Sequence, residues 1–315
     1  MEWADRIGRR IKLRDLHILL AVAQWGGMAK AAERLGISQP VVSKVIADLE
    51  HTLGVRLFDR GRQGAEPTVY GRALLKGGIA AFEELRQSVK NIEFLIDPTV
   101  GELRIGGSDP MVAGLIPTVI DQLSRQYPKI SFMVTEAESV LHQYRALRER
   151  QVEFVIGRLP RSIPEEDLEV EILFDEPLLV AAGTQNRWVR RRRIELVELI
   201  DEPWVLPGPD SFIGSIVADL FHARGLELPK NNVACGSIQM NNALLATGRY
   251  LAMYPGSFLR FSAKRLSIKV LPVELPIRST PAGIVTLKNR AISPVARLFI
   301  DRVRVMTRPL ANRKQ

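Results

Sequence analysis

Residues 28–47 read MAKAAERLGISQPVVSKVIA, and this stretch decides the fold of the first part of the chain. Two helices that cross at a steep angle need a small residue where their backbones approach, a tight turn, and apolar residues along both helices. Ala32 is the small residue, and Gly36 can take the positive φ that ends the first helix. Ser38 is a suitable N-cap, and Pro40 falls in the first turn, where its missing N–H costs nothing. The stretch therefore predicts a helix-turn-helix.

The second of these two helices is predicted to have one apolar face and one polar face. Its inward residues, at helical spacing, are Val42, Val45, Ile46 and Leu49, and its outward residues are Gln39, Ser43, Lys44 and Asp48. Gln39 suits an adenine edge in the major groove and Lys44 suits a guanine edge. Ser43 and the N–H groups at the helix start suit phosphate. An ordinary helical hairpin would also have a polar outer face, but the cap, proline, turn and apolar seam together favour DNA binding.

A basic hairpin is predicted directly after this helix. Residues 49–68, LEHTLGVRLFDRGRQGAEPT, end the helix near Gly54, continue with a short apolar run, and present an arginine-rich tip. Arginines in such a two-stranded wing can contact backbone phosphate or the minor groove, although Asp59 and Glu66 dilute the positive charge. The predicted DNA-binding residues are Ser38, Gln39, Pro40, Ser43, Lys44, Arg56, Arg60 and Arg62.

This region resembles the N-terminal part of LysR-type transcriptional regulators, whose hallmark string runs AAxxLxxSQPxxSxxIxxLExxLGxxLF. The matching residues are Ala31, Ala32, Leu35, Ser38, Gln39, Pro40, Ser43, Ile46, Leu49, Glu50, Leu53, Gly54, Leu57 and Phe58. Gly27 and Met28 replace the usual serine and aromatic residue, Lys44 stands where arginine is frequent, and Pro67 replaces a leucine in the second wing strand. The resemblance implies a sequence-specific regulator of transcription whose activity is switched by a small molecule bound between two α/β lobes.

A long helix is predicted to follow, with Thr68 as its cap. One heptad separates each of Leu75, Phe82, Val89 and Ile96, and Leu85 and Ile92 occupy the second apolar position of the later heptads. We expect this helix to dimerise, because little of the head remains to cover so long a face. The pair Gly77-Gly78 allows either a bend or a close helix crossing. A homodimer, or a homotetramer, would place two reading helices on one near-palindromic stretch of double-stranded promoter DNA.

From Leu103 onward, short apolar runs alternate with amphipathic stretches, which is typical of βαβ units and a largely parallel sheet. The predicted fold is multi-domain: an all-α winged helix-turn-helix head with a long dimerisation helix, then an α/β, periplasmic-binding-protein-like, two-lobed effector domain. The expected bounds are 1–67 for the DNA-binding domain, 68–98 for the linker helix and 99–315 for the effector domain. Lobe I would comprise 103–176 and 278–315, and lobe II 177–277.

Effector-binding residues are expected in loops beyond the carboxyl ends of the strands, where helix N-termini attract anions. This rule selects Ser108, Asp109, Glu138, Ser139, Arg158, Ser211, Phe212 and Tyr254. Each could equally be a loop residue or a helix cap, and for Asp109 that alternative is favoured because an acid repels anionic effectors. Arg158 would suit a carboxylate. The expected effector is a small molecule, either a carboxylate or a sugar.

Composition and missing motifs exclude other classes. The 315 residues carry a formal net charge of +9, which favours encounter with nucleic acid, and no apolar run approaches the roughly 18 residues of a membrane span. The polar N-terminus lacks a signal-peptide pattern, so a cytoplasmic location is expected, and the lone Cys235 agrees with a reducing compartment. Phosphate-loop, nucleophile-elbow and metal-ligand motifs are all missing, so we expect no enzyme, cofactor or metal. A solute-binding protein that serves a transporter is the other alternative, and the helical head speaks against it.

Overall fold

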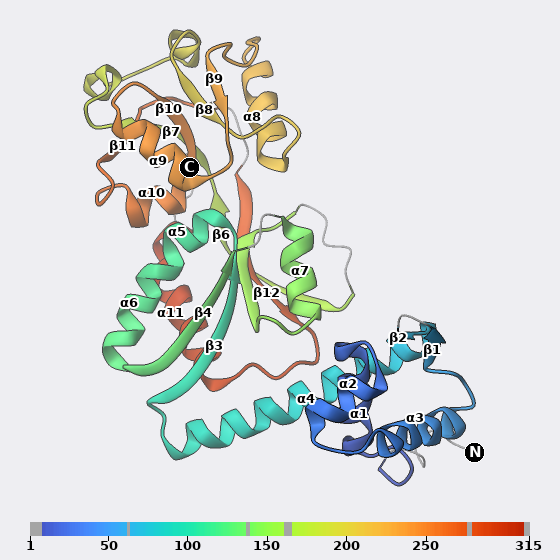
Figure 1. Ribbon diagram of the computed structural model, residues 1–315. Coiled ribbons are helices and arrows are strands. Elements are labelled where there is room, and N and C mark those ends of the chain that lie inside the picture. The colour runs from blue at the N-terminus through green and yellow to red at the C-terminus, as the bar shows by residue number, and fades with distance from the viewer. Residues whose placement is uncertain (1–7, 62–63, 137–138, 161–165, 276–278, 312–315) are drawn as a thin grey trace. The chain divides into compact units, whose positions relative to one another are not determined.

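The computed structural model describes residues 8–61, 64–136, 139–160, 166–275 and 279–311, with Arg60 described by its backbone only. The chain divides into two compact units, residues 1–90 and 91–315, and each has its own hydrophobic core (Figure 1). Within the described ranges, every helix is too short or too polar to span a bilayer.

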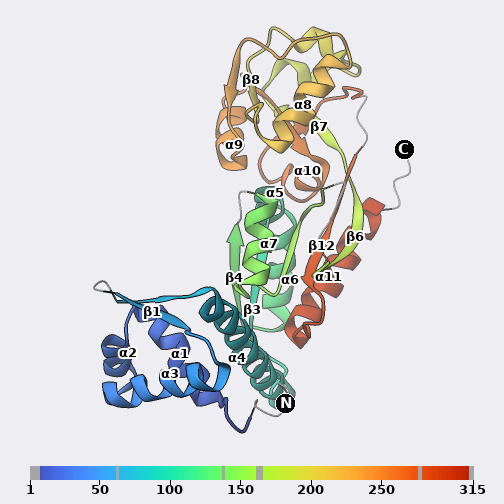
Figure 2. The same cartoon turned by 90° about the vertical axis from the view of Figure 1, so that its right-hand side faces the viewer.

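The first unit is a helical head with a hairpin (Figure 2). Its core lies between three short helices and includes Leu19, Val22, Ile46, Leu49 and Phe58. The elements are α1 (Leu13–Trp25), α2 (Met28–Leu35), α3 (Gln39–Leu53), β1 (Phe58–Gly61), β2 (Gly64–Pro67) and the long α4 (Val69–Ile96), whose last residues belong to the second unit.

Helix α4 is continuous through its glycine pair, so the helix does not break there. Gly78 is buried, and a Cβ at this position would lie in ordinary van der Waals contact with Leu16 and Leu20 of α1, at 3.9–4.0 Å, whereas Gly77 faces open space. The helix is therefore unbroken at the glycine pair, and the contact with α1 at Gly78 does not depend on glycine.

The predicted apolar seam of α4 divides into two parts. Leu75 packs against the core of the head, and the ring of Phe82 meets the ring of His17 in α1 edge-to-face at 5.9 Å. The later seam positions are exposed: Leu85, Val89, Ile92 and Ile96. The expectation that the head leaves the whole face uncovered is wrong for its first half, because α1 crosses it.

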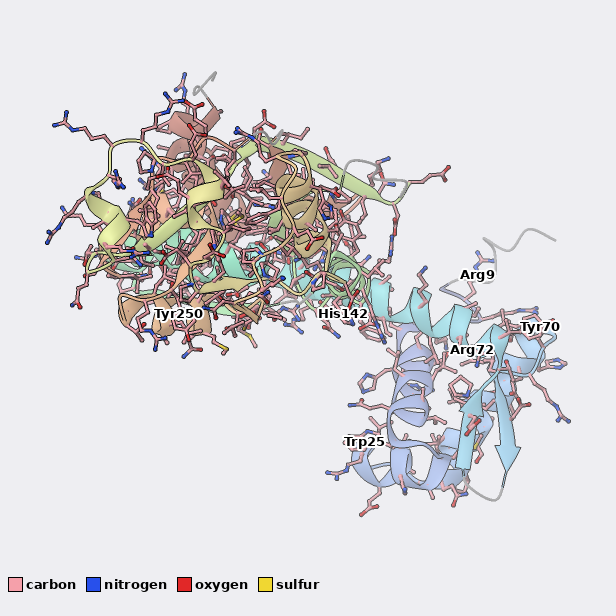
Figure 3. The ribbon with its side chains drawn as sticks, turned by 90° about the horizontal axis from the view of Figure 1, so that it is seen from above. Arg9, Trp25, Tyr70, Arg72, His142 and Tyr250 are labelled. Atoms are coloured by element: carbon pink, nitrogen blue, oxygen red, sulfur yellow. The ribbon has the colours of Figure 1, made fainter. Side chains whose placement is uncertain are left out.

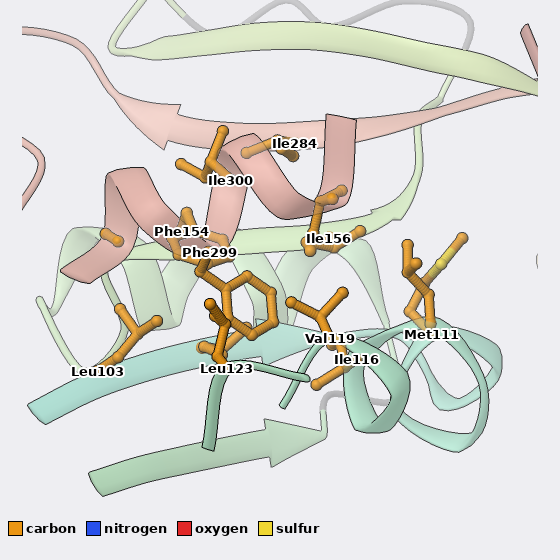
Figure 4. Packing of buried hydrophobic residues seen from close by; sticks show 14 of the residues in the cluster. Leu103, Met111, Ile116, Val119, Leu123, Phe154, Ile156, Ile284, Phe299 and Ile300 are labelled. Carbon is orange, nitrogen blue, oxygen red and sulfur yellow. The ribbon is translucent and has the colours of Figure 1, made fainter. Parts of the chain in front are cut away.

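Lobe I of the second unit is a five-stranded sheet in the order β4-β3-β5-β12-β6. Its main core lies between the sheet and α6 and α11 (Figure 4), and α7 packs with a smaller cluster that contains Tyr144 and Leu147. The elements are β3 (Val100–Gly107), α5 (Asp109–Ala113), α6 (Leu115–Gln126), β4 (Lys129–Glu136), α7 (Val140–Arg148), β5 (Phe154–Arg158), β6 (Leu168–Glu176), β12 (Thr280–Leu287) and α11 (Pro294–Ala311).

Lobe II is a second five-stranded sheet, in the order β11-β7-β10-β8-β9. One core cluster surrounds Trp204 and Phe221, and another contains Tyr254 and Phe258, with the half-buried Cys235 packed against it. The elements are β7 (Leu178–Gly183), the 3-10 turns η2 (Arg187–Arg190) and η3 (Leu196–Leu199), β8 (Trp204–Leu206), α8 (Phe212–His222), β9 (Asn232–Ala234), α9 (Ile238–Ala246), β10 (Leu251–Pro255), α10 (Gly256–Ser262) and β11 (Ile268–Val270).

Both sheets are mixed rather than largely parallel. Strand β12 pairs antiparallel with β5 and β6, and β7 pairs antiparallel with β10 and β11. The chain passes from lobe I to lobe II directly from β6 into β7, and it returns between β11 and β12. The connections from β6 to β7 and from β11 to β12 run between the lobes and contain no helix in their described residues. A helical crossover within one sheet favours parallel pairing, and these strands are not constrained in that way.

Candidate functional site

The turn between α2 and α3 is built as the sequence predicts. Gly36 has φ 66°, in the left-handed region, and the N–H of Ile37 donates to the carbonyl of Ala32 at 3.0 Å. Ser38 occupies the N-cap and Pro40 the first turn of α3. The hydroxyl of Ser38 makes no capping hydrogen bond to a described residue, while its carbonyl accepts from the N–H of Val41 at 3.0 Å. Local backbone geometry, not the serine hydroxyl, therefore fixes the start of α3.

The two faces of α3 separate apolar from polar residues. The buried residues are Val42, Val45, Ile46 and Leu49. Gln39 and Lys44 are exposed on the first half of the helix. Ser43 is half-buried, and its hydroxyl donates to Sδ of Met28 at 3.3 Å. The prediction of a fully outward Ser43 is therefore wrong, because the preceding helix supplies a partner for its hydroxyl.

Glu50 joins α3 to the hairpin. Its Oε1 accepts hydrogen bonds from the N–H groups of Leu57 at 2.8 Å and Phe58 at 3.4 Å. In the sequence, Glu50 is recognisable only as part of the hallmark string, which assigns it no role. A carboxylate that satisfies two backbone donors holds the first wing strand against α3, since each such charge-assisted bond is stronger than a neutral one.

The wing is a two-stranded antiparallel hairpin with Phe58 opposite Pro67. Pro67 is the last residue of β2, and the N–H of the next residue, Thr68, donates to the carbonyl of Leu57 at 2.9 Å. The missing proline donor therefore leaves the ladder intact. Arg56 is exposed, whereas the side chain of Arg60 and all of Arg62 lie outside the described residues.

Helix α4 is fastened to the wing at its first turn. The hydroxyl of Thr68 accepts from the N–H of Gly71 at 3.0 Å, as a helix cap, and donates to the carbonyl of Arg56 at 2.7 Å. The guanidinium of Arg72 donates to the carbonyl of Pro67 at 2.7 Å (Figure 3). Short polar contacts thus join α3, the wing and α4 within one unit.

In the second unit, several hydrogen bonds join lobe I to lobe II. The carboxylate of Asp109, at the start of α5, accepts from the N–H of Ile238 at the start of α9, at 2.8 Å. The hydroxyl of Ser262 in α10 donates to the carbonyl of Ala113 at 3.1 Å. The backbone N–H of Ser257 in α10 donates to Glu176 at 2.9 Å. We call this region, where α5 and the ends of β5 and β6 meet α9 and α10, the interlobe seam.

Arg158, the last residue of β5, is only partly exposed. Its Nη2 is buried and has no hydrogen-bond partner among the described residues. Burial lowers the pKa of Arg158, and the nearby negative charge of Glu176 opposes that shift. An unpaired guanidinium nitrogen in a buried position costs free energy, so the geometry favours a group that can accept its hydrogen bond.

Tyr254 and Asp109 form a second polar cluster at the seam. Tyr254 was predicted in a loop, but it lies within β10, is fully buried, and donates from its hydroxyl to Oδ1 of Asn242 at 2.8 Å. Burial, and to a smaller extent the charge of Asp109, raise the pKa of Tyr254. Burial also raises the pKa of Asp109, against the lowering effect of its bond from Ile238.

The other predicted effector residues have local roles or lie at helix starts. Ser139 and Ser211 cap α7 and α8, accepting hydrogen bonds from the N–H groups of His142 and Gly214. Ser108 occupies the N-cap position of α5 without a side-chain cap bond. Phe212 is exposed at the start of α8, and Glu138 lies outside the described residues. Among the residues that the structure describes, no cluster of His, Cys, Asp and Glu could hold a metal.

Sequence reasoning missed Glu176 and Ser257. Glu176 is 1% exposed, and its carboxylate accepts from both the N–H and the hydroxyl of Ser257. Burial raises the pKa of Glu176, while the bonds from Ser257 and the charge of Arg158 oppose the shift. The available signal was a glutamate at the end of the stretch LEVEILFDE, directly before Pro177.

The chain matches two family models over most of its length. "LysR substrate binding domain" matches residues 97–307, and "Bacterial regulatory helix-turn-helix protein, lysR family" matches residues 13–72. The regulator GbpR of Azospirillum brasilense is 28% identical over 297 residues, which cover 94% of this chain and 86% of the relative. The uncharacterized regulator YdcI of Escherichia coli is 26% identical, with 96% and 98% covered.

Solved structures agree in fold. A full-length OxyR from Pseudomonas aeruginosa, solved as a cysteine-to-aspartate variant, has a TM-score of 0.63 at 23% identity, covering 97% of this chain and 99% of that one. CbnR complexed with its target DNA has a TM-score of 0.52 at 22% identity, covering 94% and 100%. The predicted winged head and two-lobed α/β domain are confirmed by these likenesses together with the two family models.

Proposed function

Because the chain belongs to the LysR family of transcriptional regulators, we propose that its α3 reads promoter DNA and that its interlobe seam receives the effector. The family assignment makes the chain a DNA-binding regulator with an effector-binding domain, and the expectation that it is not an enzyme is confirmed. A regulator that binds chromosomal promoters would act in the cytoplasm, which is the location we propose.

The observation that carries the DNA proposal is the exposed polar face of α3. Gln39 and Lys44 are exposed on the N-terminal half of the helix, where side chains of a major-groove helix reach base edges. Ser38, Pro40 and the exposed Arg56 would lie against phosphate, with Arg60 and Arg62 at the wing. Ser43 would contribute less than the sequence suggests, because its hydroxyl already donates to Met28.

Self-association is proposed through the second half of α4. The exposed apolar residues there are Leu85, Val89, Ile92, Leu95 and Ile96, with Ile92 57% and Ile96 79% exposed. A helix surface so apolar is stable in water only when it is covered, and a second copy has the matching heptad surface. Paired heads of a homodimer or homotetramer would then favour a near-palindromic site.

The effector is proposed to be a carboxylate or a sugar bound at the interlobe seam. Support comes from Nη2 of Arg158, which has no hydrogen-bond partner among the described residues and can donate to a carboxylate or to a hydroxyl. Asp109 and Tyr254 lie at the same seam, and the remaining proposed contacts are Ser108, Glu138, Ser139, Ser211 and Phe212.

Gel retardation with the full-length protein tests the DNA proposal. A duplex carrying the promoter of the neighbouring gene should be retarded more strongly than a scrambled duplex, and retardation should weaken steeply as salt is raised. Gln39→Ala should remove most of the preference for the promoter. Equal retardation of both duplexes by the unaltered protein, or no dependence on salt, would contradict the proposal.

A further inference from the structure

Glu176 connects the lobes at the point where the chain crosses between them. It is the last residue of β6 in lobe I, and Pro177 and β7 of lobe II follow directly. Its carboxylate accepts hydrogen bonds from the N–H of Ser257, at 2.9 Å, and from the Ser257 hydroxyl, in the first turn of α10. The carboxylate therefore fixes the start of a lobe II helix to the end of a lobe I strand.

Sheet register places Glu176 and Arg158 on one face of lobe I. Along β12, Thr280 is opposite Glu176 and Ala282 is opposite Arg158. Thr280 and Ala282 are two residues apart, and directly opposed residues share a face, so all four side chains lie on the same face. The two charged side chains thus stand diagonally across β12.

The two charges influence each other without direct contact. Among the ion pairs of the described residues, none joins Arg158 to Glu176, yet each offsets the pKa shift that burial causes in the other. Both lie in a poorly solvated region, where charges interact over longer distances than in water. The described residues leave Nη2 of Arg158 without an acceptor even so.

We propose that Glu176 is a specificity-determining residue of the effector site, whose negative charge partly compensates Arg158 and thereby limits how strongly that arginine can hold an anion. This rests on the proposed function, in which the effector binds beside Arg158. An incoming carboxylate is attracted by Arg158 and repelled by Glu176, whereas an uncharged ligand is affected little by either charge. Glu176 thus sets the balance between anionic and neutral effectors.

The Glu176→Gln variant tests the proposal, because the direction of the change in carboxylate affinity distinguishes an effect of charge from a structural effect. Glutamine keeps an acceptor for the N–H of Ser257 and removes the negative charge. Carboxylate probes should therefore bind about tenfold more tightly to the variant, given the size of charge interactions at a partly solvated site. Ser257→Ala is the matched control, because it removes one bond to Glu176 without altering any charge. A purely structural role predicts that both variants weaken binding.

The probes are butyrate, phenylacetate and gluconate, each paired with its uncharged amide or parent sugar. Affinity is measured calorimetrically on the full-length protein at constant ionic strength, so that screening is the same throughout. At least one carboxylate should gain affinity in Glu176→Gln while its neutral partner does not. The gain should vanish when Arg158→Gln is added. Should Glu176→Gln fail to fold, Glu176→Met removes the same charge at similar volume.

The proposal is overturned if no carboxylate binds the charge-free variant more tightly than the unaltered protein, or if the gain survives Arg158→Gln. Promoter retardation by the same variants, measured without any probe, distinguishes failure of the role of Glu176 from failure of the proposed DNA-binding function. Intact retardation with no gain in carboxylate affinity removes the role of Glu176 and leaves the DNA-binding proposal standing. If the unaltered protein shows no preference for the promoter, the proposed function itself is contradicted.

Discussion

Replacing Gly71 with alanine should destabilise the head strongly, because the first turn of α4 leaves no space for a side chain. A Cβ built on Gly71 would lie 2.0 Å from the carbonyl oxygen of Leu57 and 3.1 Å from its carbon. Relief needs a backbone shift of about 1 Å, which would strain the bonds from Thr68 to Leu57 and from Gly71 to Thr68. Overpacking of this kind and weakening of two such bonds together cost about 2–4 kcal/mol.

Gly77→Ala is the matched control on the same helix. Gly77 faces open space in a helix interior, so alanine there should stabilise the head by about 1 kcal/mol. Hydrogen exchange followed by mass spectrometry on the full-length protein reports the local opening free energy of the peptides that cover α3 and the hairpin. These peptides should exchange faster in Gly71→Ala and slightly slower in Gly77→Ala. Unchanged or slower exchange in Gly71→Ala would refute the reasoning.

Three further predictions concern reading, assembly and acid stability. Gln39→Ala should weaken promoter binding by about 1–3 kcal/mol and leave binding to random DNA unaffected. Arg56→Ala should weaken binding to both and lower the slope of log affinity against log salt concentration by about one. Gel retardation across a salt series distinguishes the two variants. Ile92→Asp should lower the oligomeric state measured by light scattering, since a charge in the proposed interface would be buried unpaired; an unchanged mass contradicts that interface. Hydrogen bonds from Thr99, together with Lys129, lower the pKa of Asp97 to about 2 from the usual 3.8, so the stability that Asp97 contributes is complete above pH 3.8 and is lost as the pH falls towards 2. Asp97→Asn should therefore flatten the acid limb of a urea-denaturation series, and an unchanged limb would contradict the assignment.

The head could be predicted from sequence because its signals are local. Gly36 and Pro40 fix the turn through their own backbone preferences, and Val42 to Leu49 repeat at helical spacing. What the sequence could not provide were contacts between elements. The hydroxyl of Ser43 points to Met28 on the preceding helix, and α1 covers Phe82, which looked free to meet a partner.

The interlobe seam was less accessible to sequence reasoning because residues far apart in the chain build it. Asp109 and Ile238 are 129 positions apart, and no local pattern indicates that they meet. Tyr254 was selected as a loop residue, but β10 extends one residue beyond it and buries it. Ser139 and Ser211 carry the same serine-before-helix signal as a ligand site, yet their hydroxyls cap their own helices. The rule that ligands lie near helix starts therefore selects caps and ligand contacts alike.

Within the described residues, two helix starts of lobe II each donate a backbone N–H to an acid of lobe I. Asp109 takes the N–H of Ile238 in α9, and Glu176 takes the N–H of Ser257 in α10. These two N–H groups are therefore not free for an anionic effector, which agrees with the proposed position beside Arg158, whose Nη2 has no partner among the described residues. In the proposed site, an anion beside Arg158 would interact with the charge of Glu176, which holds α10, so anion binding and the strength of that interlobe bond should affect each other. Because such coupling is reciprocal, a change that loosens α10 from Glu176 should also change the affinity of the seam for anions.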